Sequence, residues 1–264
     1  MLLYNRKEPV LKTRYRKRTK KHMIEFENVT KYYKEQVGLE NVSVSIKMGD
    51  FVFLVGPSGA GKSTFVKLML KELEADSGVI RFGDMEVGKL SNREIPLLRR
   101  GIGIVFQDFR LLPKKTAFEN VAFAMEIVRS TKRTIKRQVP QVLDLVGIPD
   151  KGDKYPHELS AGEQQRVAVA RAIVNNPTVL IADEPTGNLD PDTAWGIMRV
   201  LERINNRGTT VIMVTHAKEI VDRMNKRVIA IENGHIIRDD VGSYGYKESQ
   251  KCVPEEGAFG NYGD

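Results

Sequence analysis

The 264-residue sequence predicts a mixed α/β fold with an antiparallel β part near the N-terminus and an inserted helical part in the middle. Three observations predict this class. Short apolar runs typical of buried strands recur along the chain and alternate with helical patterns. A glycine-rich segment lies directly between one such strand and a helix. Between about residues 108 and 156 the strand pattern disappears, and two helical stretches replace it.

Antiparallel strands are expected at the start of the folded part. Residues 24–29 alternate apolar and polar side chains, as a half-buried strand should, and residues 42–46 repeat the pattern. The turn 48–50 then leads into a fully apolar strand over residues 51–55. One further short strand is expected over residues 79–82.

The glycine-rich segment matches the phosphate-binding pattern G-x-x-x-x-G-K-[ST] at every position. Its glycines let backbone N–H groups face phosphate oxygens, and the helix that follows adds the positive end of its dipole. Lys62 is expected to meet the β- and γ-phosphates, and Ser63 to ligate Mg²⁺. The expected nucleotide contacts here are Gly56, Pro57, Ser58, Gly59, Ala60, Gly61, Lys62, Ser63 and Thr64.

The helical insertion is predicted to follow the next strand. The apolar run 102–106 ends at Gln107, a polar residue at the C-terminal edge of a buried strand, where α/β sheets bind ligands. Apolar residues then recur at helical spacing over residues 118–125 and 135–145. A capping box, Ser160 with Glu163, marks the start of one more helix, and without further context it indicates only a well-capped helix.

Two later strands end in side chains that can do chemistry. The apolar run from residue 179 ends in Asp183 and Glu184, and the run 211–215 ends at His216. Downstream of a phosphate-binding loop, a carboxylate in the first of these positions is where a Mg²⁺ ligand belongs. A hairpin with a type I′ turn at Asn233-Gly234 is then expected.

The excess of positive charge lies in the first 22 residues. The chain carries a formal net charge of +8, and this segment accounts for all of it. We interpret it as a basic disordered arm that stays in solvent or attracts anionic lipid or nucleic acid. If translation begins at Met23, the arm is absent. Residues 239–264 are expected to be a flexible tail that includes the single cysteine, Cys252.

The expected location is cytoplasmic. No apolar run reaches the ~18 to 20 residues needed to cross a bilayer, and the start does not match a secretory signal. A single cysteine excludes an internal disulfide, which fits a reducing compartment.

Taken in order, these motifs resemble those of the ATP-binding cassette (ABC) ATPases over roughly residues 23–238. The resemblance implies a P-loop NTPase core of the ABC type with an antiparallel β subdomain and an inserted α-helical subdomain that carries the signature motif. It also implies a head-to-tail homodimer that holds two ATP molecules at its interface. The residues that carry it are the phosphate-binding loop, Gln107, Leu159–Glu163, Asp183-Glu184 and His216.

The resemblance implies roles within one subunit. Glu184 is expected to be the general base that orients the attacking water, and His216 to hold the γ-phosphate and Glu184 in place. Gln107 is expected to contact the metal and the water, while Asp183 holds Mg²⁺ through water together with Ser63. Tyr33 is expected to stack on adenine. From the residues alone it fits a strand-edge tyrosine, and only the spacing selects it over Tyr32.

Other residues are expected to act on the partner's nucleotide. Ser160, Gly162 and Glu163 would bind the ATP of the second subunit, with the helix dipole contributing. Asp190 would lie at the dimer interface. Ala161 departs from the family pattern, which has glycine here, and its methyl group is expected to slow turnover without abolishing it.

The segment 92–100 further resembles the branch of the superfamily that acts in bacterial cell division. It implies an ATPase that dimerises on ATP, lies at the cytoplasmic face of the membrane and passes its motion to an integral membrane partner regulating cell-wall hydrolysis. The alternative is the ATPase of a lipoprotein-release or macrolide-efflux transporter. A DNA motor is disfavoured because residues 108–158 contain no heptads or cysteine pairs. The expected domains are a core of residues 23–106 and 161–238 and a helical subdomain of residues 107–160.

Overall fold

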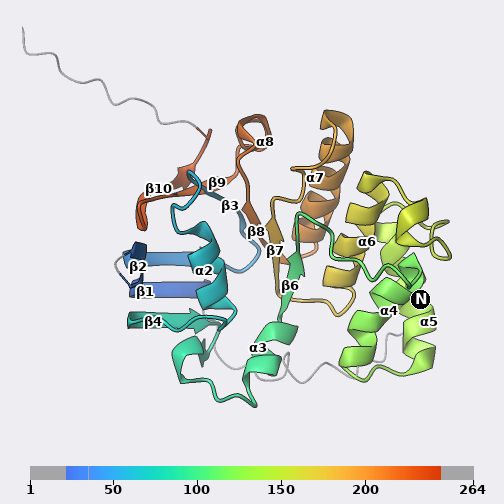
Figure 1. Cartoon of the computed structure of the whole chain (residues 1–264), viewed down its shortest axis with the longest axis horizontal. Coiled ribbons are helices and arrows are strands. Elements are labelled where there is room, and N and C mark those ends of the chain that lie inside the picture. The colour runs from blue at the N-terminus through green and yellow to red at the C-terminus, as the bar shows by residue number, and fades with distance from the viewer. Residues whose placement is uncertain (1–21, 35, 245–264) are drawn as a thin grey trace, which may run out of the picture.

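The computed structural model describes residues 22–34 and 36–244, which form two β-sheets and a group of helices (Figure 1). The basic arm up to residue 21, Cys252 and the tail beyond residue 244 lie outside the described residues. The mixed α/β class predicted from the sequence is confirmed.

The smaller sheet is antiparallel and has the strand order β2-β1-β4-β5. The predicted alternation places one face of each strand in a core, where Phe26 of β1 stacks on Phe65 of α2 with ring centroids 4.2 Å apart. This contact fixes the sheet against the helix that follows the phosphate-binding loop. The elements involved are β1 (His22–Tyr33), β2 (Gln36–Lys47), β4 (Ser77–Phe82), β5 (Met85–Glu86) and α2 (Lys62–Met69).

The larger sheet has the strand order β10-β9-β3-β8-β7-β6, and all its neighbouring strands are parallel except the pair β9 and β10. All five residues of β3 are buried, as expected for a central parallel strand. The carboxyl ends of parallel strands meet at one edge of a sheet, so the segments that follow β3, β6, β7 and β8 converge there. The strands are β3 (Phe51–Val55), β6 (Ile102–Val105), β7 (Val179–Asp183), β8 (Thr210–Val214), β9 (Arg227–Glu232) and β10 (His235–Val241).

A group of helices lies beyond β6, at the side of the molecule away from the antiparallel sheet (Figure 1). The predicted insertion forms α4 (Ala117–Ile127) and α5 (Lys132–Leu145), and α6 (Ala161–Ile173) packs on both. Because α6 also contacts β6 and α7, it joins this group to the larger sheet. The remaining helices are α3 (Ile95–Arg100), α7 (Pro191–Asn206), α8 (Lys218–Met224), η1 (Val87–Lys89) and η2 (Pro156–Glu158).

The C-terminal hairpin extends further than the sequence predicted. The Asn233-Gly234 turn has positive φ at both residues, 48° and 80°, as a type I′ turn requires. Strand β10 then continues to Val241, so residues 239–241 belong to the sheet and not to the expected tail. The reason is that Asp239 pairs with Arg227 of β9, at 2.6 Å from Nε and 2.7 Å from Nη2.

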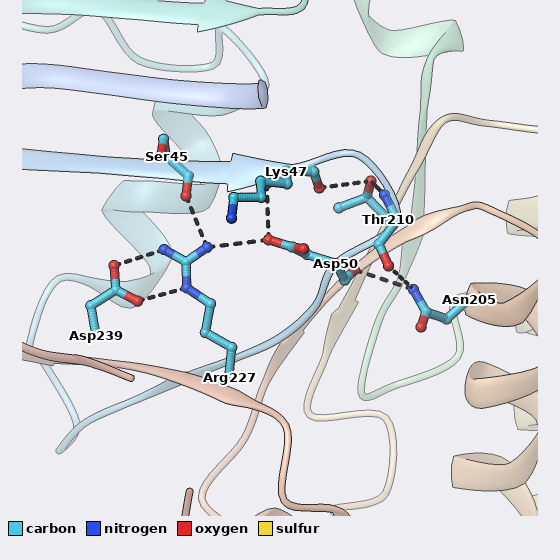
Figure 2. Close-up of polar contacts among 8 residues, drawn as sticks. Ser45, Lys47, Asp50, Asn205, Thr210, Arg227 and Asp239 are labelled. Atoms are coloured by element: carbon cyan, nitrogen blue, oxygen red, sulfur yellow. Dashed lines mark hydrogen bonds and ion pairs between the residues drawn. The ribbon is translucent and has the colours of Figure 1, made fainter. Parts of the chain in front are cut away.

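Arg227 is the centre of a polar network at the end of the sheet where β3 begins (Figure 2). Besides Asp239, its guanidinium donates to the backbone oxygen of Ser45 at 2.9 Å and to the Asp50 carboxylate at 3.2 Å. Asp50 in turn accepts from the backbone N–H of Lys47 at 2.9 Å. We call these residues, with Asn205 and Thr210 beside them, the Arg227 network. It fastens β2, the turn before β3 and the C-terminal hairpin together.

Candidate functional site

The phosphate-binding loop needs its glycines because other chain segments approach it closely. Gly61 has φ +113°, and a Cβ there would lie 2.4 Å from the backbone oxygen of Gly38. Gly56 has φ +146°, and a Cβ there would lie 2.0 Å from the backbone oxygen of Ile231. Both conformations are strained for residues with a side chain. The loop is therefore pressed between β2 and β9.

Lys62 is the first residue of α2, and its side chain reaches back to this loop. Its side chain is buried, and Nζ donates to the backbone oxygens of Gly56 at 2.7 Å and Pro57 at 2.8 Å. Burial lowers the pKa of the Lys62 ammonium, while the nearby carboxylates of Glu184 and Asp183 oppose this effect. The Lys62 amino group thus lies near enough to the Asp183 and Glu184 carboxylates, at the end of β7, to interact with them electrostatically.

Asp183 is the last residue of β7, and Glu184 follows it directly. Burial, and next the charge of Glu184, raise the pKa of Asp183, whereas Lys62 lowers it. Glu184 has φ +46°, and its N–H donates to the backbone oxygen of Val214 at 2.9 Å. Its Oε1 lies 3.1 Å from Nε2 of His216. Positive φ is uncommon for glutamate, and such strain often accompanies function.

Gln107 lies beside the loop that follows Glu184. Its backbone oxygen accepts a hydrogen bond from Asn188 Nδ2 at 3.3 Å. A Cβ placed on Gly187 would lie 3.1 Å from Gln107 Nε2, so the amide packs against this loop. The structure thus brings Gln107 and Glu184 to the same edge of the larger sheet.

Tyr33, and not Tyr32, faces the phosphate-binding helix. The Tyr33 hydroxyl lies 3.3 Å from Oγ1 of Thr64, and a Cβ on Gly38 would lie 2.7 Å from the Tyr33 ring. The Tyr32 hydroxyl instead donates to Glu40 at 2.9 Å. Sequence reasoning missed Gly38, because its role comes from close packing and no local pattern marks it.

The capping box of α6 forms as predicted. Ser160 Oγ accepts from the N–H of Glu163 at 3.3 Å, and Glu163 Oε2 accepts from the N–H of Ser160 at 2.9 Å. Lys151 adds an ion pair to Glu163 at 3.1 Å. These bonds, the one from the Ser160 N–H first, lower the pKa of Glu163. The start of α6 is therefore fixed, and Ser160 is exposed on it.

The two residues between Ser160 and Glu163 have different surroundings. Ala161 is exposed, whereas Gly162 is buried against α7, where a Cβ would lie 2.3 Å from Thr193 Cγ2. Asp190 caps α7 by accepting from the N–H of Thr193 at 3.0 Å. Among the described residues, no hydrogen bond or ion pair joins Ser160–Glu163 to the phosphate-binding loop. Two separate groups of predicted site residues therefore exist within one chain.

The donor set suits magnesium. The residues expected near the ion are the Ser63 hydroxyl, the Asp183 carboxylate and the Gln107 amide, which are hard oxygen ligands. Within the described part of the chain, no group of three or more His, Cys, Asp or Glu residues could hold a metal. Mg²⁺ usually binds through one or two carboxylates together with substrate phosphates, so this sparse set fits an ion that arrives with a nucleotide.

Comparison with known proteins identifies the family. The family model described as ABC transporter matches residues 39–187. The cell division ATP-binding protein FtsE of Streptococcus pneumoniae is 54% identical over 228 residues, which cover 86% of this chain and 99% of that protein. The chain belongs to the FtsE family of ABC ATPases. FtsE of Bacillus subtilis is 56% identical and covers 84% of this chain and 99% of its own length.

A solved structure resembles this FtsE-family chain over most of its length. It is a dimeric structure of a post-hydrolysis state of the ATP-binding cassette MJ0796 bound to ADP and Pi. The two align with a TM-score of 0.74 and 34% identity, over 83% of this chain and 98% of the other. The family and the P-loop NTPase fold predicted from the motifs are thereby confirmed. Among residues 22–34 and 36–244, no helix is both long and apolar enough to cross a membrane.

Proposed function

We propose that this FtsE-family ATPase works as a Mg²⁺-dependent homodimer at the cytoplasmic face of the cell membrane, bound to an integral membrane protein that resembles FtsX. Its closing on ATP and opening after hydrolysis would be passed to that partner, which regulates cell-wall hydrolysis during division. The observation that supports this proposal is the placement of Lys62, Asp183, Glu184 and His216 at one edge of the sheet. Contact of the basic arm with anionic lipid is also proposed, on its charge alone.

Hydrolysis is assigned to this edge by its chemistry. Phosphoryl transfer depends mainly on positioning and on stabilising charge. Lys62 would turn from the loop carbonyls to the β- and γ-phosphates, and Glu184 would orient the attacking water. His216, 3.1 Å from Glu184, would hold that carboxylate and the γ-phosphate. When bound, Mg²⁺ supplies positive charge to the phosphate oxygens, and Ser63, Asp183 and Gln107 would hold it.

The separation of the two groups of site residues supports dimerisation. Ser160 and Gly162 start a capped helix whose positive end makes no hydrogen bond or ion pair with the chain's own phosphate-binding loop in the described residues. In a head-to-tail dimer this helix start, with Glu163 supporting it, would meet the partner's γ-phosphate. The dimeric MJ0796 cassette with ADP and Pi supports such an arrangement.

The substitution Glu184→Gln tests the ATPase and dimer parts together. Because a general base contributes roughly 10²- to 10⁴-fold, steady-state hydrolysis should fall by at least about 100-fold. With hydrolysis blocked, ATP should hold the protein as a dimer in size-exclusion chromatography. The matched control, Glu219→Gln, changes an exposed helix residue and should hydrolyse normally. Hydrolysis by Glu184→Gln at the wild-type rate would remove Glu184 from this role.

The partner is tested by purifying the native protein from membranes and identifying what accompanies it. An FtsX-like protein without a transported substrate is expected. A lipoprotein-release or macrolide-efflux permease in its place would overturn the cell-division part of the proposal and leave the ATPase intact.

A further inference from the structure

The segment that follows Gln107 has a strained backbone. Phe109 and Arg110 are consecutive residues with φ of 57° and 48°. Positive φ in a bulky residue such as phenylalanine is a true outlier, and two in succession are held only where surrounding contacts fix the backbone. The surrounding contacts must therefore stabilise this backbone conformation.

Arg171 holds both strained residues. Its Nη2 donates to the backbone oxygen of Phe109 at 2.8 Å, and its Nη1 donates to that of Arg110 at 2.6 Å. Arg171 belongs to α6, so these bonds cross 62 and 61 positions of sequence. Burial lowers the pKa of the Arg171 guanidinium. Among the described residues, the two carbonyls are the only hydrogen-bond partners of this group.

A second side chain holds the far end of the same segment. Asn120 of α4 is fully buried, and its Oδ1 accepts from the N–H of Leu112 at 2.7 Å. Its Nδ2 donates to the backbone oxygens of Leu112 at 3.2 Å and Lys115 at 2.9 Å. Residues 109–115 are therefore held to α4 and α6 by side-chain hydrogen bonds. On the other side of this segment, the backbone oxygen of Gln107 accepts a hydrogen bond from Asn188, in the loop after Glu184.

We propose that Arg171 is a positioning residue. By bonding the backbone of Phe109 and Arg110 to α6, it determines the position of Gln107. The helix that begins with Ser160 and Gly162 carries this anchor near its other end. This inference rests on the proposed function, in which Gln107 contacts the metal and the attacking water. Arg171 itself touches neither.

The test compares Arg171→Met with Arg171→Lys in the full chain. Loss of the guanidinium should lower kcat by roughly 10- to 100-fold, since a misplacement of about 1 Å costs on this order. ATP affinity, measured in the Glu184→Gln background, should change less than about twofold, because Tyr33 and the phosphate-binding loop are untouched. Lysine retains a donor and should restore part of kcat. The control Arg199→Met alters an exposed α7 residue and should leave kcat unchanged.

A double-mutant cycle separates positioning from general loss of stability. Glycine adopts positive φ freely, so in a Phe109→Gly background Arg171→Met should lower kcat several-fold less than in the wild type. An equal loss in both backgrounds, or an equal fall of kcat and ATP affinity, would overturn the inference. If Arg171→Met does not fold, Arg171→Lys is carried through the same cycle. Failure of the proposed function is recognised separately, because the wild type would then lack hydrolysis that depends on Glu184.

Discussion

Replacing Gly162 with alanine tests whether its packing against α7 requires glycine at this position. Such a requirement would be separate from any role in nucleotide binding. The new Cβ would lie 2.3 Å from Thr193 Cγ2, and Thr193 is a β-branched residue in the first turn of α7 with little freedom to move. Overpacking of this kind costs about 1–3 kcal/mol. The higher helix propensity of alanine stabilises the folded protein by about 0.5–1 kcal/mol relative to glycine and offsets part of this cost. We therefore expect a net loss of roughly 1 kcal/mol.

Chemical denaturation measures this free energy of unfolding, and a second substitution supplies the control. Thr193→Ser removes Cγ2 but keeps the hydroxyl and the N–H that Asp190 caps. In that background Gly162→Ala should become neutral or stabilising by up to about 1 kcal/mol. The reasoning is refuted if Gly162→Ala costs the same with threonine and with serine at position 193.

Two further predictions concern the same segment. Ala161→Gly should raise the steady-state ATPase rate if the methyl group of Ala161 crowds the partner's nucleotide, and an unchanged rate would show that the exposed methyl is harmless. Glu163→Gln should lower stability at neutral pH but less so in acid. The reason is that the lowered pKa of Glu163 makes its ionised form stabilising above about pH 4.3, and this contribution is lost as the pH falls through the folded-state pKa. Urea melts from pH 3 to 7 check this, with the exposed Glu126→Gln expected to leave the profile unchanged; a difference independent of pH would contradict it.

Much of the fold could be predicted because its signals are local. Strand 51–55, the loop after it and the capping box at Ser160 each depend on neighbouring residues, and the structure forms all three. The positions of Gln107 and His216 at strand ends could be predicted because each follows an apolar run typical of a buried strand. Parallel pairing then places such strand ends at one edge, which is a rule of topology and needs no tertiary detail.

The features that sequence reasoning missed depend on residues far apart in the chain. Arg171 reaches carbonyls 61 and 62 positions away, and the periodicity of α6 indicates only that it is a helix. The extension of β10 depends on the pair of Arg227 and Asp239, which a polar, glycine-rich sequence does not reveal. The contact of Gly162 with Thr193 likewise joins two helices whose packing no local pattern specifies.

The Arg227 network fixes the N-terminal end of β3, and the phosphate-binding loop follows its C-terminal end. Because the strand is paired on both sides and buried along its whole length, a shift by one residue would turn Phe51 and Phe53 to the wrong face. An ATPase that converts hydrolysis into movement needs a rigid part relative to which the other parts move. Arg227 holds the residue before β3, and the phosphate-binding loop holds the residues after it. The strand is therefore suited to be this rigid support.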